Sequence, residues 1–152
     1  MKKFELTSEF VTFLGKTLFR IKALVSFGDV AEGELGGFIE RENNLDQSGD
    51  AWVYGDARVF GNAWVCGDAR VFGDAWVQNC RDYSATSCFG SENRTTTFFR
   101  TKDGGISVRC GCFYGTMSEF REKVKERHGD SRLAKEYLML ADLMEFRLSK
   151  DE

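Results

Sequence analysis

Hydrophobic and polar positions repeat with a fixed six-residue period between Gly49 and Gln78. Five hexads run without a break, each reading Gly-Asp or Gly-Asn, then Ala, then Trp or Arg, then Val and a variable sixth residue. Side chains alternate between the two faces of an extended chain, so Ala and Val point inward and the residue between them points outward. Gly accepts positive φ, and Asp or Asn can hydrogen-bond the local backbone, so each Gly-Asx pair predicts a turn. A fixed internal period predicts a solenoid whose units stack on their neighbours.

These hexads resemble the hexapeptide repeat of left-handed parallel β-helix proteins. The resemblance implies that three hexads make one triangular coil of about 18 residues, stacked on the next at about 4.8 Å. Many members of that family are acyltransferases or γ-class carbonic anhydrases, and most are trimers. The segment from Phe27 to Leu45 also resembles the entry segment of uncharacterised hexapeptide-repeat proteins of bacterial and phage genomes, which are labelled transferases on fold grounds only.

The expected fold class is therefore mainly β: a left-handed parallel β-helix with an N-terminal hairpin cap and a small C-terminal α+β appendage. The hairpin cap is expected over residues 1–26 and the β-helix over residues 27–95. The step from Leu45 to Val53 is eight residues instead of six, which indicates a degenerate first coil. Polar residues 79–95 are expected to form an irregular last coil or loop.

Residues 96–152 are expected to contain a second hairpin followed by two helices. The hairpin joins Thr96–Thr101 to Ile106–Cys112 through a Gly-containing turn. Thr116 or Ser118 begins a helix that ends near His128 before Gly129, and Ser131 begins another.

Five outward positions alternate between tryptophan and arginine, namely Trp52, Arg58, Trp64, Arg70 and Trp76. Because a coil has three faces, Trp52 is expected to stack on Arg70 and Arg58 on Trp76, as cation–π pairs. Tyr54, Phe60 and Phe72 add aromatic surface at the corners of the coils. One interpretation is that these ladders only rigidify the wall. The other is that these eight residues bind a ligand or a neighbouring subunit, since Trp and Arg are enriched at binding surfaces.

Catalytic chemistry has little support in the repeat. Family acyltransferases use a histidine base and the carbonic anhydrases need three histidine ligands, whereas the single histidine here, His128, lies at a predicted helix end. Cys80, Cys88, Cys110 and Cys112 could form a zinc site, although their spacing is not that of common zinc knuckles, and buried thiols are the alternative. No cofactor or metal is expected, and the Asp and Asn residues of the hexads are interpreted as turn formers.

Composition narrows the class of partner. The chain has 152 residues, 42% hydrophobic and 30% charged, with a net charge of −3. That charge gives no global basic field for nucleic acid. No signal peptide or membrane span is evident, and the odd number of cysteines, five, favours reduced thiols in a cytoplasm.

Three functions remain open at this point. The first is a non-catalytic homo-oligomer, expected to be a trimer, that sequesters a small anionic or nucleotide-like ligand or blocks a host defence protein; the resemblance to phage-borne proteins implies a phage origin for it. The second is a hexapeptide-repeat acyltransferase with a relocated base. The third is a structural trimerisation or protein-interaction module whose C-terminal helices contact a partner.

Overall fold

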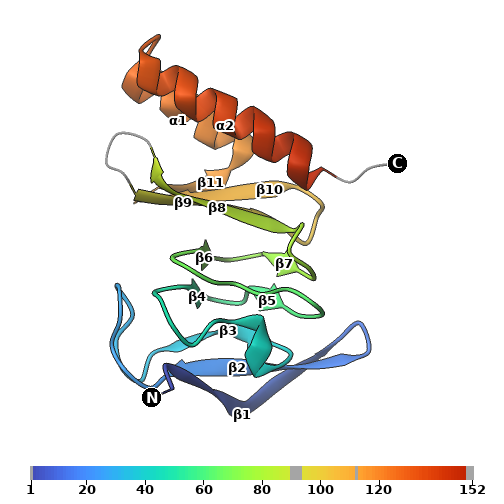
Figure 1. The fold of residues 1–152 in the computed structure, drawn as a ribbon. Coiled ribbons are helices and arrows are strands. Elements are labelled where there is room, and N and C mark those ends of the chain that lie inside the picture. The colour runs from blue at the N-terminus through green and yellow to red at the C-terminus, as the bar shows by residue number, and fades with distance from the viewer. Residues whose placement is uncertain (1, 90–93, 112, 150–152) are drawn as a thin grey trace.

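The computed structural model describes residues 2–89, 94–111 and 113–149. Its strands are β1 (Phe4–Phe13), β2 (Lys16–Ala23), β3 (Leu35–Ile39), β4 (Trp52–Val53), β5 (Arg58–Val59), β6 (Arg70–Val71), β7 (Trp76–Val77), β8 (Tyr83–Phe89), β9 (Arg94–Arg100), β10 (Ile106–Cys110) and β11 (Phe113–Thr116). A 3₁₀ helix, η1 (Glu42–Asn44), follows β3, and two α-helices, α1 (Met117–His128) and α2 (Arg132–Leu148), close the chain. The elements stack in chain order, from the β1–β2 hairpin at one end to the helices at the other (Figure 1).

The expected fold class, a left-handed parallel β-helix, is wrong. Within the described residues the strands form three sheets of five, four and two strands, in the orders β1-β2-β3-β5-β7, β11-β10-β9-β8 and β4-β6. The first sheet is mixed, because the antiparallel strands β1, β2 and β3 continue into the parallel strands β5 and β7. Five hexads with such short strands do not dominate the fold, and antiparallel strands extend the structure at both ends.

The pairing of the hexads nevertheless follows the predicted register. Trp52 pairs with Arg70 and Arg58 with Trp76, both in parallel and each three hexads apart in the sequence. Earlier pairs, such as Ile39 with Val59, are separated by slightly more than three hexads. The excess corresponds to the longer step that follows Leu45.

The inward positions of the hexads form the centre of the larger core. All five alanines and all five valines are at most 2% exposed, which confirms their predicted orientation. They are Ala51, Ala57, Ala63, Ala69, Ala75, Val53, Val59, Val65, Val71 and Val77. Burying a valine side chain contributes about 1.5–3 kcal/mol, so the repeat is held together chiefly by this apolar column.

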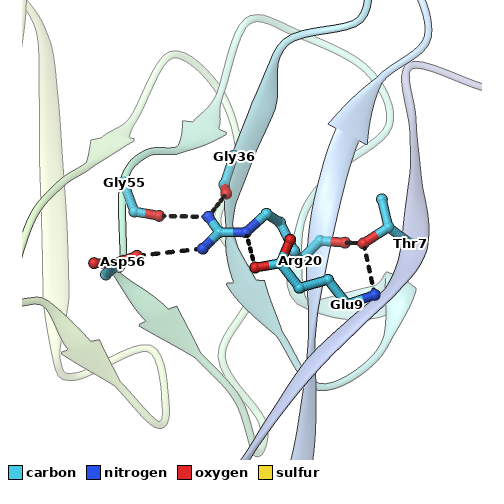
Figure 2. Close-up of polar contacts among 6 residues, drawn as sticks. All are labelled: Thr7, Glu9, Arg20, Gly36, Gly55 and Asp56. Atoms are coloured by element: carbon cyan, nitrogen blue, oxygen red, sulfur yellow. Dashed lines mark hydrogen bonds and ion pairs between the residues drawn. The ribbon is translucent and has the colours of Figure 1, made fainter.

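The N-terminal hairpin is present, with its tight turn at Leu14-Gly15. Both residues have positive φ, as a tight hairpin turn requires. Arg20 of β2 fastens this hairpin to the hexads (Figure 2). Its guanidinium donates to Gly36 O at 2.7 Å and Gly55 O at 3.2 Å, and pairs with Glu9 at 2.9 Å and Asp56 at 3.4 Å. One side chain thus joins the hairpin, β3 and a hexad turn.

The C-terminal sheet lies between the hexads and the helices (Figure 1). Successive residues of β9 face opposite sides, so Phe99 packs with the hexad core and Phe98 with α1 and α2. The predicted loop over residues 79–95 is wrong, since Tyr83–Phe89 form strand β8, which pairs with β9. The Ser and Thr residues of this polar segment lie on a strand because the neighbouring strand β9 pairs with its backbone.

Both helices begin where predicted. Thr116 caps α1, accepting from Glu119 N at 3.1 Å while the Glu119 carboxylate accepts from Thr116 N, and Ser131 caps α2 by accepting from Ala134 N. Gly129, with φ of 57°, ends α1. No helix among the described residues is both long and apolar enough to cross a membrane.

We predict that Gly36→Ala destabilises the protein strongly. A Cβ at Gly36 would lie 2.6 Å from Val53 O and 2.8 Å from the Trp52 ring, so backbone strands would have to separate. The expected loss in free energy of unfolding is about 3 kcal/mol, measured by urea denaturation. Gly105→Ala is the control, because its Cβ would meet only side-chain oxygens at 3.3 and 3.5 Å. Equal effects of the two substitutions would contradict this account.

Candidate functional site

The eight predicted site residues do not form one exposed surface. Trp52 and Phe60 were expected to point outward but are only 0% and 2% exposed. Trp52 packs edge-on against Phe4 and Phe27, because the N-terminal hairpin and the segment after it fold over this side of the hexads. Trp64 is half exposed, at 50%. The remaining residues separate into two groups on different parts of the molecule.

The first group packs the tip of the hairpin. Phe13 at the end of β1 contacts Trp76 edge-on at 4.6 Å and Phe60 at 5.3 Å, between ring centroids. The Arg58 guanidinium lies over the Phe13 ring at 4.6 Å. The predicted cation–π partner of Arg58 was Trp76. In the structure the Arg58 guanidinium covers Phe13 of the hairpin instead. These contacts anchor the hairpin, and we assign them a structural role.

The second group forms what we call the aromatic–arginine surface, made by Tyr54, Phe72, Arg109 and Tyr114. Tyr54 and Phe72 come from equivalent positions of hexads that are stacked on each other, and their rings stack at 4.0 Å with 9° between planes. The Arg109 guanidinium lies over Phe72 at 4.5 Å, and the Tyr114 ring lies 5.5 Å from Phe72. The surface therefore spans the hexads and the C-terminal sheet.

One edge of this surface is closed by an ion pair. Asp29 accepts hydrogen bonds from Tyr54 Oη and Arg70 Nη1, both at 2.8 Å. Arg70 was expected to stack on Trp52, but its charge is directed to Asp29 because the Trp52 ring is buried. Burial by itself would raise the pKa of Asp29, but the hydrogen bond from Tyr54 and the charge of Arg70 outweigh it and hold that pKa below its usual value. Burial and the hydrogen bond to Asp29 raise the pKa of Tyr54, so its hydroxyl stays a donor.

Arg109 is the cation of the surface for which the described residues provide no carboxylate partner. Its Nε is buried and has no hydrogen-bond partner, and among the described residues it forms no ion pair. Cross-strand pairing places Arg109 of β10 directly opposite Tyr114 of β11. The surface thus offers a cation and three rings, and no carboxylate of the described residues is bound to that cation.

Sequence reasoning missed Arg109 and Tyr114. Both lie on strands outside the hexads, and no local pattern distinguishes them from other residues of a hairpin. The sequence offers one signal, the aromatic residue that recurs at the corner of the hexads at Tyr54 and Phe72. This recurrence predicts two stacked rings, and a residue from another element has to cover the last ring.

An open pocket of about 530 Å³ lies beside Tyr114. Its lining includes three carboxylates, those of Asp74, Asp103 and Glu119. Burial and the nearby charge of Asp74 raise the pKa of Tyr114. A negatively charged group is repelled by this pocket, so an anion on the surface belongs at the Arg109 side.

The residues with catalytic or metal-binding chemistry lie elsewhere. His128 stacks on Tyr137 at 5.6 Å, between the two helices. In the part of the chain that the structure describes, no three His, Cys, Asp or Glu side chains are grouped to hold a metal. Cys80 is exposed and Cys110 accepts from Thr96 Oγ1 at 3.2 Å. Of the other candidate zinc ligands, Cys112 and the side chain of Cys88 lie outside the described residues.

No protein-family model and no curated protein matches this chain. The resemblance to hexapeptide-repeat proteins therefore stays a prediction, and the surface has to be interpreted from its own chemistry.

The Asp29 ion pair predicts a pH-dependent contribution to stability. The pKa of Asp29 is lower in the folded protein, so its contribution is present above the unfolded pKa of about 3.9 and is lost as pH falls through the folded value. Asp29 is half exposed, so Asp29→Asn should lower the free energy of unfolding at pH 6 by only about 0.5–1 kcal/mol. We expect the difference from the wild type to shrink as pH falls below about 4, as measured by urea denaturation.

Asp130→Asn is the matched control, because Asp130 is an exposed aspartate between the two helices. It should follow the wild type at both ends of the pH range. A constant deficit of Asp29→Asn at all pH values would instead assign Asp29 a purely steric role.

Proposed function

We propose that this protein is a non-catalytic binding protein that captures a planar, anionic small molecule of the nucleotide type on the aromatic–arginine surface. The observation that carries the proposal is Arg109, a cation lying 4.5 Å from the Phe72 ring with a buried, unpartnered Nε. Because that Nε is covered by protein, a ligand on the surface would not bond to it; a bound phosphate or carboxylate would instead neutralise the charge of the guanidinium.

The rings beside Arg109 suit a flat ligand. Phe72 and Tyr54 are partly buried against the hexad core, which fixes their planes, and the Tyr114 ring is 43% exposed. Base-on-aromatic stacking contributes about 1–3 kcal/mol per base and is tolerant of base identity. Arg109 then selects ligands that carry a negative charge next to a planar ring.

Electrostatics restrict where the charged part of such a ligand lies. Arg70 is already paired with Asp29, and the pocket on the far side of Tyr114 is lined by carboxylates. We therefore place the phosphate at Arg109 and the planar ring over Tyr114, because Tyr54 and Arg109 already cover the two faces of Phe72. This arrangement suits one nucleotide-sized molecule. Arg109, Phe72 and the Tyr114 hydroxyl, whose pKa is raised, act neither as base nor as nucleophile near neutral pH, which is why we favour sequestration over acyl transfer.

The proposed compartment is the cytoplasm, where nucleotides are abundant and thiols stay reduced. Cys66, Cys80 and Cys110 are free thiols in the structure. A phage-borne role in removing a host signalling nucleotide is a specific form of this proposal, whereas blocking a host defence protein is a separate alternative to it.

We predict that Arg109→Gln lowers the affinity for nucleotides at least about tenfold, because a charge-assisted hydrogen bond and a cation are both lost. Isothermal titration calorimetry with a panel of mono-, di- and triphosphates and cyclic nucleotides measures the effect. Tyr114→Leu should weaken binding to a similar extent, since it removes the exposed ring of the surface and keeps an apolar side chain.

Arg127→Gln is the control, because Arg127 is an exposed arginine in the last turn of α1. It should bind as the wild type does. The proposal would be contradicted if no nucleotide gave a heat of binding, or if Arg109→Gln bound nucleotides with the affinity of the wild type. Transfer of acetyl from acetyl-CoA, detected by mass spectrometry and abolished by His128→Ala, would replace it with the acyltransferase.

A further inference from the structure

Helix α2 leaves three large apolar side chains uncovered on its outer face. Met139, Leu143 and Phe146 are 71%, 56% and 80% exposed. Their spacing of four and three residues places them on one side of the helix. The opposite side carries the buried residues that pack on α1 and the four-stranded sheet, namely Ala134, Tyr137, Leu140, Ala141, Met144 and Leu148. A helix with apolar residues on both sides has a second packing partner.

The charges beside this outer stripe indicate what the partner is. Glu136 and Arg147 lie on the same side of the stripe, both about 60–80° around the helix from Met139 at 3.6 residues per turn. Within the described residues neither forms an ion pair, whereas Asp142 on the other side of the stripe is held by Arg121 at 2.6 Å. Asp142 is thus neutralised within the chain, whereas the flank of Glu136 and Arg147 carries two opposite charges that are unpaired within the described residues.

Opposite charges at the two ends of one flank are complementary to themselves. When two identical helices pack antiparallel about a two-fold axis, flanks of the same side meet and the sequence runs in reverse. An axis midway between Glu136 and Arg147 places each Glu136 beside Arg147 of the second copy. It also places Met139 between Leu143 and Phe146 of the second copy, so the apolar side chains interdigitate.

We propose that α2 is a dimerisation helix that pairs antiparallel with α2 of a second copy of this chain. The two helices bury the Met139, Leu143 and Phe146 stripes against each other and form the Glu136–Arg147 ion pair twice. The position of α2 at one end of the molecule leaves its outer face open to such a contact (Figure 1). A contact of this size belongs with weak interfaces, for which we expect a dissociation constant on the order of 10 µM.

Sedimentation equilibrium of the full chain over a concentration series tests the dimer. The wild type should show a monomer–dimer equilibrium, and Leu143→Glu should shift the dissociation constant at least about thirtyfold by placing a charge in the stripe. Circular dichroism should stay unchanged, because Leu143 is exposed. Leu14→Glu is the control: Leu14 is a similarly exposed leucine at the hairpin tip and should not alter the equilibrium.

Charge exchange tests the antiparallel orientation. Glu136→Arg and Arg147→Glu should each weaken the dimer about tenfold, because like charges then face each other. Both the double variant and an equimolar mixture of the two single variants restore opposite charges across the axis and should restore wild-type association. A monomer at all concentrations, an assembly insensitive to Leu143→Glu, or single variants that fail to recover on mixing would each overturn the proposal.

Discussion

Parallel backbone pairing between stacked hexads is the constraint on which the rest of this structure depends. Trp52 N donates to Ala69 O at 3.1 Å, and Arg58 N donates to Ala75 O at 2.9 Å. Each hexad offers only a short flat segment, which is not stable alone and obtains its partners from the hexad above or below. The small Ala and the branched Val beneath these bonds set the width of the core. A side chain added where two backbone segments lie in close contact, as at Gly36 beside Val53, would push the stacked segments apart.

The two ends of this stack need closure, because unpaired strands attract other chains. At one end, the hairpin covers the hexads through β3, and Arg20 ties three segments together. At the other end, the C-terminal sheet contacts the last hexads through the bridge between Ala75 and Thr101 and through Lys102 N, which donates to Asp74 O. That sheet is itself fastened to α2 by Arg100, which donates to Leu148 O and pairs with Asp82.

The aromatic–arginine surface exists because these parts meet. Hexads supply Tyr54 and Phe72 as stacked rings, and the C-terminal sheet brings Arg109 over the last of them. The Arg109 guanidinium lies against an aromatic face, and its Nε is buried and unpaired. The outer face of α2 lies in the helical layer beyond that sheet, so the proposed ligand capture and the proposed self-association use separate surfaces.

Sequence by itself determined the local structure. The period of six fixed which Ala and Val point inward and that Trp52 pairs with Arg70, since these depend only on alternation along a strand and on the length of the repeat. Capping residues likewise fixed the starts of both helices, because Thr116 and Ser131 act within one turn. Only the tertiary structure decided which outward residues stay outward. Trp52 and Phe60 are buried by the segment from Phe4 to Phe27, and Arg109 reaches Phe72 from a strand far along the sequence. Such contacts depend on how separate elements pack, and the sequence of a repeat does not indicate which other segments cover it.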